Sequence, residues 1–132
     1  MGLLEIGADD AAANRRRAEY VVLRLLNERS EIACDDLDRQ VATVHDRLLN
    51  PGHDSPFYFQ TGGSNGPESR ELNESIERLL RYGKINLTED RCYHLTREGR
   101  DYLDNTDRLE RDRIDPQFRD ALADVIPDTD GS

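Results

Sequence analysis

The stretch from Pro67 to Tyr82 constrains the fold of this chain more than any other part of the sequence. Apolar residues recur through it at the spacing of one helical face, and these are Leu72, Ile76, Leu79 and Leu80. Proline suits a first helical position, and Gly83 follows the last turn, as glycine commonly does after a helix. We therefore expect an amphipathic helix over residues 67–82, with its apolar stripe buried and its polar face exposed.

A β-hairpin pattern follows this helix directly. Residues 84–87 and 92–95 have the character of short strands, and the polar residues 88–91 between them suit a turn. Upstream, residues 30–33 are too few for more than a β-bridge, in which Ile32 should point inward. Together these patterns predict a mainly α protein with a small β-hairpin wing, which is an α+β winged helix-turn-helix extended by terminal dimerisation helices.

Helical periodicity also predicts two helices before this region. The stripe within residues 13–28 consists of Ala18, Val21, Val22, Leu25 and Leu26. The stripe of the next helix, which should end before residue 50, consists of Leu37, Val41, Val44 and Leu48. Arg15, Arg16 and Arg17 would lie in the first turn of the earlier helix, where the helix dipole disfavours cations. That cost suggests a phosphate contact or a subunit salt bridge, although a solvated basic patch explains it equally well.

The chain divides into four expected segments. These are an N-terminal arm (1–12), a winged helix-turn-helix domain (13–104), C-terminal dimerisation helices (105–126) and a disordered tail (127–132). Asp115-Pro116 should break the third segment into two helices. Because a narrow apolar seam on a charged helix favours contact with a second subunit, we expect a homodimer. The expected dimerisation residues are Leu109, Ile114, Phe118, Leu122 and Val125.

The charge composition predicts a protein that works at high salt concentration. The 132 residues carry 28 acidic and 18 basic side chains, and only one of the basic residues, Lys84, is a lysine. This composition resembles that of proteins from halophilic archaea, whose cytoplasm is saturated with salt. At molar salt the Debye length is about 3 Å, so a net charge of −10 no longer excludes DNA as a partner. The acidic residues are concentrated after residue 100. This distribution fits either an acidic surface on the side of the protein away from DNA or a tail that only increases solubility.

No segment of the sequence predicts contact with a membrane. The chain lacks a run of eighteen apolar residues, and its first ten residues lack the basic flank and apolar stretch of a secretory signal. We therefore expect a cytoplasmic protein with no membrane partner.

The polar face of the 67–82 helix and its surroundings predict double-stranded DNA as the partner. Arg70 can bond bidentately to guanine, and Asn73 suits adenine. The glycine-rich segment 61–66 could present N–H groups to a phosphate or could be a simple connector. The expected DNA-binding residues are Thr61, Ser64, Asn65, Ser69, Arg70, Asn73, Arg81, Lys84 and Arg91. Ion pairs at i,i+4 compete with this assignment, and they are Arg70 with Glu74, Glu74 with Arg78, and Glu77 with Arg81.

No residue pattern predicts catalysis. The chain shows no Ser/His/Asp order, no cofactor loop and no metal-ligand spacing among its histidines and cysteines, so we expect neither an enzyme nor a cofactor. Monovalent cations or a halide are the only bound ions that the composition favours. Cys34, at a helix start, could be a redox sensor or a small packed residue.

One motif resembles a known family. Tyr93-His94-Leu95-Thr96-Arg97-Glu98-Gly99, followed by Leu103, resembles the Y-x-L-T-x-x-G-x-x-x-L signature that closes the wing in PadR-like winged-helix regulators. The resemblance covers residues 17–103, and the composition makes haloarchaeal members of this family, including oxidative-stress regulators, the most similar. It implies a transcription regulator that binds a pseudo-palindromic promoter site as a homodimer. The alternative is a winged-helix protein-interaction module, such as an adaptor or an antitoxin-like domain, that does not read DNA.

Overall fold

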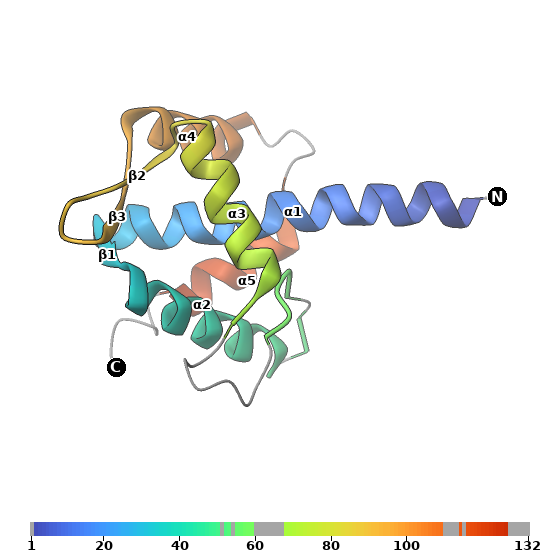
Figure 1. Ribbon diagram of the computed structural model, residues 1–132. Coiled ribbons are helices and arrows are strands. Elements are labelled where there is room, and N and C mark those ends of the chain that lie inside the picture. The colour runs from blue at the N-terminus through green and yellow to red at the C-terminus, as the bar shows by residue number, and fades with distance from the viewer. Residues whose placement is uncertain are drawn as a thin grey trace.

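The computed structural model describes residues 2–50, 52–53, 55–59, 68–109, 114 and 116–126, with side chains from residue 13 to residue 105 and from 114 onward in those ranges. The elements in chain order are α1 (Gly2–Arg29), β1 (Glu31–Ala33), α2 (Cys34–Leu49), α3 (Arg70–Arg81), β2 (Ile85–Leu87), β3 (Cys92–Leu95), α4 (Arg97–Leu109) and α5 (Pro116–Val125). The chain is therefore mainly helical with a small antiparallel sheet, and this part of the predicted α+β class is confirmed (Figure 1).

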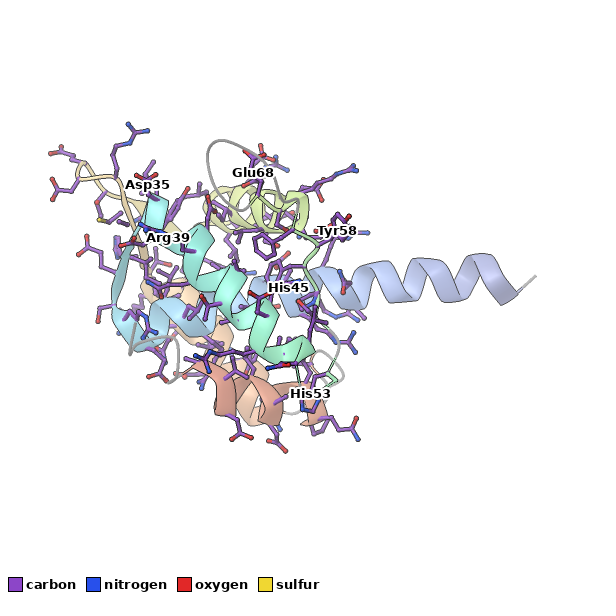
Figure 2. All side chains as sticks on the ribbon, turned by 90° about the horizontal axis from the view of Figure 1, so that it is seen from below. Asp35, Arg39, His45, His53, Tyr58 and Glu68 are labelled. Carbon is purple, nitrogen blue, oxygen red and sulfur yellow. The ribbon has the colours of Figure 1, made fainter. Side chains whose placement is uncertain are left out.

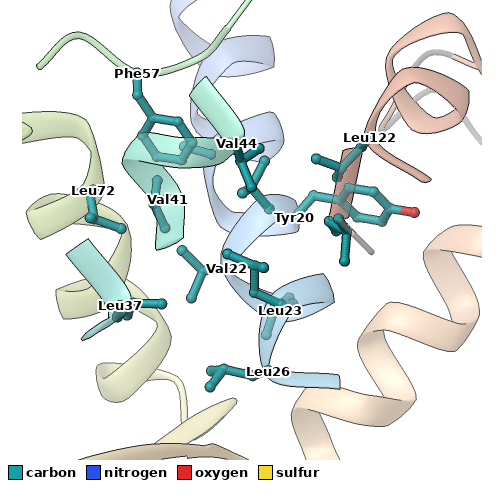
Figure 3. Close-up of a cluster of buried hydrophobic side chains, with 14 of the residues drawn as sticks. Tyr20, Val22, Leu23, Leu26, Leu37, Val41, Val44, Phe57, Leu72 and Leu122 are labelled. Atoms are coloured by element: carbon teal, nitrogen blue, oxygen red, sulfur yellow. The ribbon is translucent and has the colours of Figure 1, made fainter. Parts of the chain in front are cut away.

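Helix α1 is the central element of the fold. It packs against α3 and α4, and Figure 3 shows α3 and α5 on opposite sides of it. The predicted stripe from Ala18 to Leu26 is buried, and Tyr20 and Leu23 are buried as well because neighbours cover α1 on more than one side. The predicted stripe of α2 is likewise confirmed, since all four of its residues are fully buried.

The expected start of the first helix near Ala13 is wrong. Helix α1 already begins at Gly2, and its N-terminal part projects beyond the rest of the molecule, so the expected arm is helical (Figure 1). Arg15, Arg16 and Arg17 consequently lie well inside a long helix, where the dipole argument does not apply, because the effect falls off within the first turn. The Arg17 guanidinium instead lies 5.8 Å from the centre of the Phe118 ring, over its face.

The sheet has the strand order β1-β3-β2 with antiparallel pairing throughout. The predicted hairpin is confirmed, with Ile85 opposite Leu95 and Leu87 opposite Tyr93. Residues 31–33 form a full strand rather than a single bridge, because all three pair with β3, and Ile32 is buried as expected. The sheet thus joins the start of α2 to the hairpin that follows α3.

The Thr-x-x-Gly part of the motif fastens α4 to the end of α3. The Thr96 hydroxyl donates to the Gly83 carbonyl at 2.6 Å and accepts from the Gly99 N–H at 3.0 Å, which makes Thr96 the N-cap of α4. The Thr96 N–H donates to the Lys84 carbonyl at 3.1 Å. Gly99 lies so close to Lys84 that a side chain there would strike the Lys84 backbone. The motif therefore serves a close contact of two backbone segments.

The expected dimerisation seam is wrong for its described side chains. Ile114, Phe118, Leu122 and Val125 are all buried within the chain's own core, together with Ala121 and Ile126. Helix α5 packs on α2 of the same chain, and Tyr20 and Leu122 lie close together in Figure 3. The side chain of Leu109 lies outside the described residues. The predicted break at Asp115-Pro116 is confirmed to the extent that α5 begins at Pro116, separate from α4.

Candidate nucleic-acid interface

Helix α3 begins later than expected because Ser69 caps it. Its first residue is Arg70 rather than Pro67, and the Ser69 hydroxyl accepts from the Leu72 N–H at 3.3 Å. The same hydroxyl donates to Glu71 Oε1 at 3.1 Å. With 2% of its surface exposed, Ser69 is a buried cap, and its expected role as a phosphate contact is wrong.

The two faces of α3 differ sharply. Leu72, Ser75, Ile76 and Leu79 are buried, whereas Leu80, which was expected in the stripe, is 36% exposed. Leu80 falls at the edge of the stripe, one turn after Ile76. Buried Ser75 is satisfied because its hydroxyl donates to the Glu71 carbonyl at 2.8 Å. The opposite face is exposed, and its residues are Arg70, Asn73, Glu77 and Arg81.

An ion pair fixes α3 against α1. Arg78 Nε donates to Glu19 Oε2 at 2.6 Å, and the two side chains are only 22% and 16% exposed. The sequence suggests Glu74 as the partner of Arg78, but the guanidinium pairs with Glu19 on α1 instead. Because the pair is largely shielded from water, salt screens it less than it screens an exposed pair. It therefore helps to hold the orientation of α3 at high ionic strength.

Arg70 forms the local ion pair that the sequence offered as the alternative. Its Nε lies 3.2 Å from Glu74 Oε2, one turn along α3, and its side chain is 85% exposed. Asn73 and Arg81 are also exposed. These three expected site residues share one face of one helix, and this arrangement can present hydrogen-bond donors to a groove.

The remaining expected contacts lie on other segments. Thr61, Ser64 and Asn65 fall outside the described residues. Lys84 is half-buried, and its ammonium lies 3.8 Å from the centre of the Tyr102 ring, in a cation–π contact. Arg91 is exposed in the turn between β2 and β3, with a φ of 62°. Its carbonyl accepts from the Cys34 N–H at 3.0 Å, so the hairpin turn is tied to the start of α2.

Tyr58, in the segment between α2 and α3, is a candidate site residue that no sequence pattern predicts. Phe57 is buried and Phe59 packs against the core, but Tyr58 is 71% exposed. Its N–H donates to Glu71 Oε1 at 2.9 Å, so Tyr58 lies at the first turn of α3. No periodic pattern could have separated Tyr58 from its neighbours, because the segment is irregular.

The fold brings Cys34, the first residue of α2, close to Cys92, the first residue of β3. Ala33 pairs with Cys92 across β1 and β3, so Cys34 and Cys92 lie close to each other although they are distant in the sequence. Burial, followed by the negative charges of Glu31 and Asp90, raises the pKa of the Cys92 thiol, which disfavours its thiolate. Burial and a hydrogen bond with Cys34 raise the pKa of Tyr93 to about 12.

The environment of Asp38, on α2, disfavours the ionised form of its carboxyl group. Partial burial, followed by repulsion from Asp35 and Glu68, raises its pKa above the ordinary 3.8. Figure 2 shows Asp35 and Glu68 on the same side of the molecule. Because the folded protein holds this proton more tightly than the unfolded chain does, ionisation of Asp38 lowers stability as the pH rises. No group of three or more potential ligands within the described residues could hold a metal ion.

Comparisons with protein-family models, curated proteins and solved structures found no match to this chain. In addition, the described helices include none that is both long enough and apolar enough to span a bilayer.

Proposed function

We propose that the protein is a sequence-specific DNA-binding transcription regulator with a winged helix-turn-helix fold. It acts in the cytoplasm as a homodimer at high salt, as its resemblance to PadR-like regulators implies. The observation that carries this proposal is α3, which is buried along one side, pinned to α1 through Arg78, and exposed along the face of Arg70, Asn73 and Arg81. In helix-turn-helix proteins a helix of this kind lies in the major groove, with its N-terminal residues nearest the bases.

The order of the elements supports the same fold. A hairpin, β2–β3, follows α3 directly, and β1 adds to it as a third strand that precedes α2. The hairpin would act as the wing, with Arg91 in its turn beside the DNA backbone. The contacts of Thr96 and Gly99 give the family-like motif a physical role, since they set the position of the hairpin relative to α3.

The Arg70–Glu74 ion pair is compatible with base contact. An exposed i,i+4 pair is worth about 0.3–0.5 kcal/mol, whereas a bidentate contact of arginine with guanine discriminates by about 1–3 kcal/mol. Molar salt weakens the pair further. Arg70 can therefore leave Glu74 for a base at little cost.

The homodimer needs a subunit surface other than the expected seam. Phe118 and Leu122 pack within one chain, so the apolar seam of α5 is already used. Light scattering in molar KCl would give the number of chains in the free protein and in its DNA complex. We expect two chains per DNA site.

Selection from a random DNA pool in KCl, followed by anisotropy titration of the selected duplex, tests the function. Ordinary basic DNA binders lose affinity steeply with salt through counterion release. This protein should retain selective binding in about 2 M KCl, because short-range hydrogen bonds carry its specificity. If no sequence is enriched and no selective binding occurs between moderate and molar KCl, the regulator assignment fails.

A protein-interaction module is the second candidate. The observation that favours it is the exposure of large apolar side chains, Leu80 and Tyr82 at the end of α3 and Leu87 on β2. Exposed apolar side chains that form a contiguous patch mark protein-binding surfaces. This candidate predicts that the pool selection enriches no sequence.

A further inference from the structure

The segment Ser55–Phe59 is fastened to α1 and α2 before it reaches α3. The Pro56 carbonyl accepts from Asn14 Nδ2, on α1, at 2.9 Å. Ser55 Oγ lies 2.7 Å from His45 Nδ1, on α2, and the same oxygen accepts from the backbone N–H two residues later at 3.2 Å. A segment without regular secondary structure is thus held in one conformation by side chains of two helices.

The same segment is also fastened to α3, at Tyr58 itself. The Tyr58 N–H donates to Glu71 Oε1 at 2.9 Å, and that oxygen also accepts from the Ser69 hydroxyl at the helix cap. The flanking rings are packed, with Phe57 buried and Phe59 against the His45 ring at 5.2 Å between centres. Tyr58 alone of the three rings points outward, with 71% of its surface exposed.

A rigidly held, exposed tyrosine is suited to binding. An aromatic side chain on a fixed backbone loses little conformational freedom when it meets a partner, so more of the contact energy becomes affinity. The bond to Glu71 places the Tyr58 backbone at the first turn of α3, next in the sequence to exposed Arg70, and Figure 2 shows Tyr58 near α3. A ligand that covers the first turn of α3 would therefore also lie near Tyr58.

We propose that Tyr58 contacts the sugar–phosphate backbone of the DNA that α3 reads. Its ring would pack against a deoxyribose and its hydroxyl would donate to a phosphate. Contacts of this kind fix the register and orientation of a protein on the duplex without reading sequence. Glu71 acts as a positioning residue, because it ties the Tyr58 backbone to the first turn of α3. The proposal rests on the DNA-binding function proposed above.

Anisotropy titrations with Tyr58→Phe test the contact. This variant removes only the hydroxyl, and we expect about a tenfold loss of affinity on both the selected duplex and a scrambled duplex of equal length. The slope of log Kd against log KCl should not change, because the lost group carries no charge. Tyr82→Phe is the matched control, since Tyr82 is an exposed tyrosine near the other end of α3, and it should bind as the wild type does.

Glu71→Ala separates positioning from electrostatics. Removal of a negative charge beside the DNA would by itself strengthen binding, whereas the proposal predicts weaker binding because Tyr58 loses its anchor. Tyr58→Phe should then cost less than tenfold in the Glu71→Ala background, since coupled residues are not additive. Thermal unfolding in the same buffer confirms that each variant is folded.

The outcomes distinguish the proposal from the function on which it rests. If the wild type binds DNA selectively and Tyr58→Phe binds equally well, the Tyr58 contact is refuted and the regulator function stands. If the wild type shows no selective binding, both fail. If Tyr58→Ala changes the number of chains in light scattering, Tyr58 belongs to a subunit contact and the proposal is overturned.

Discussion

Replacement of Gly99 by alanine should destabilise the protein far more than a one-methyl change suggests. A Cβ at this position would lie 2.7 Å from Leu95 Cδ1 and 3.0 Å from the Lys84 carbonyl carbon, inside the ordinary contact distance of about 3.5–4.0 Å. Overpacking of this kind costs about 1–3 kcal/mol. Movement of α4 away from Lys84 would also weaken the two hydrogen bonds that Thr96 donates to the Gly83 and Lys84 carbonyls, at about 1 kcal/mol each. The higher helix propensity of alanine offsets about 1 kcal/mol of this cost, so the free energy of unfolding should fall by about 2–4 kcal/mol.

Urea unfolding at a fixed KCl concentration, followed by circular dichroism, measures this loss. With an m value of about 1–3 kcal/mol per molar urea, the midpoint should fall by about 1 M or more. Gly52→Ala is the control for an added methyl group without a clash, because no atom lies within 4 Å of a Cβ at Gly52, although Gly52, unlike Gly99, has a positive φ of +100°. Gly52→Ala should lower the free energy of unfolding by only about 1–2 kcal/mol, through backbone strain. If Gly99→Ala is as stable as the wild type, the packing account of the Thr-x-x-Gly motif is refuted.

Three further predictions address α5, the ion pair between α1 and α3, and α2. Phe118→Ala should lower the free energy of unfolding by about 3–5 kcal/mol, because a buried ring leaves a cavity, and light scattering should show an unchanged number of chains. Glu19→Gln should cost about 1–3 kcal/mol in urea unfolding, and the loss should persist at molar KCl because Arg78 is largely buried; a loss that disappears with salt would contradict this. Asp38→Asn should stabilise the protein at pH 7 by less than about 1 kcal/mol, since the side chain is partly exposed. This gain in stability should shrink as the pH falls toward 3.8, because the wild-type carboxyl then takes up its proton. Thermal unfolding of the wild type and of Asp38→Asn from pH 7 to pH 4 measures the gain, and a gain that grows as the pH falls would contradict the raised pKa.

Helical and strand periodicity predicted the elements whose burial is one-sided. The stripe of α2 and the hairpin over residues 85–95 follow from spacing alone, because each element has a single apolar face or a clear turn. The extent of α1 could not be predicted in this way. Its first residues have no regular apolar face, and a helix that projects beyond the core carries no burial signal.

Periodicity indicates that a residue is buried but not what covers it. The sequence pattern of α5 predicts contact with a second subunit, whereas its stripe packs on α2 of the same chain. Ser69 illustrates the same limit for polar residues, since a serine before a helix can be a cap or an exposed donor. The Arg78–Glu19 pair joins residues distant in the sequence, so local i,i+4 rules could not find it.

The central claim is that the exposed face of α3 reads DNA, and a double substitution on that face tests it most directly. Kd values for the selected and scrambled duplexes in about 2 M KCl should be compared for the wild type, Arg70→Ala with Asn73→Ala, and Arg119→Ala. Arg119 is the matched control, because it lies on α5, which Figure 3 shows on the far side of α1 from α3. We predict that the double variant loses the difference between the two duplexes while its fold and number of chains are unchanged, and that Arg119→Ala keeps it. If the double variant discriminates between the duplexes as well as the wild type does, α3 does not read DNA.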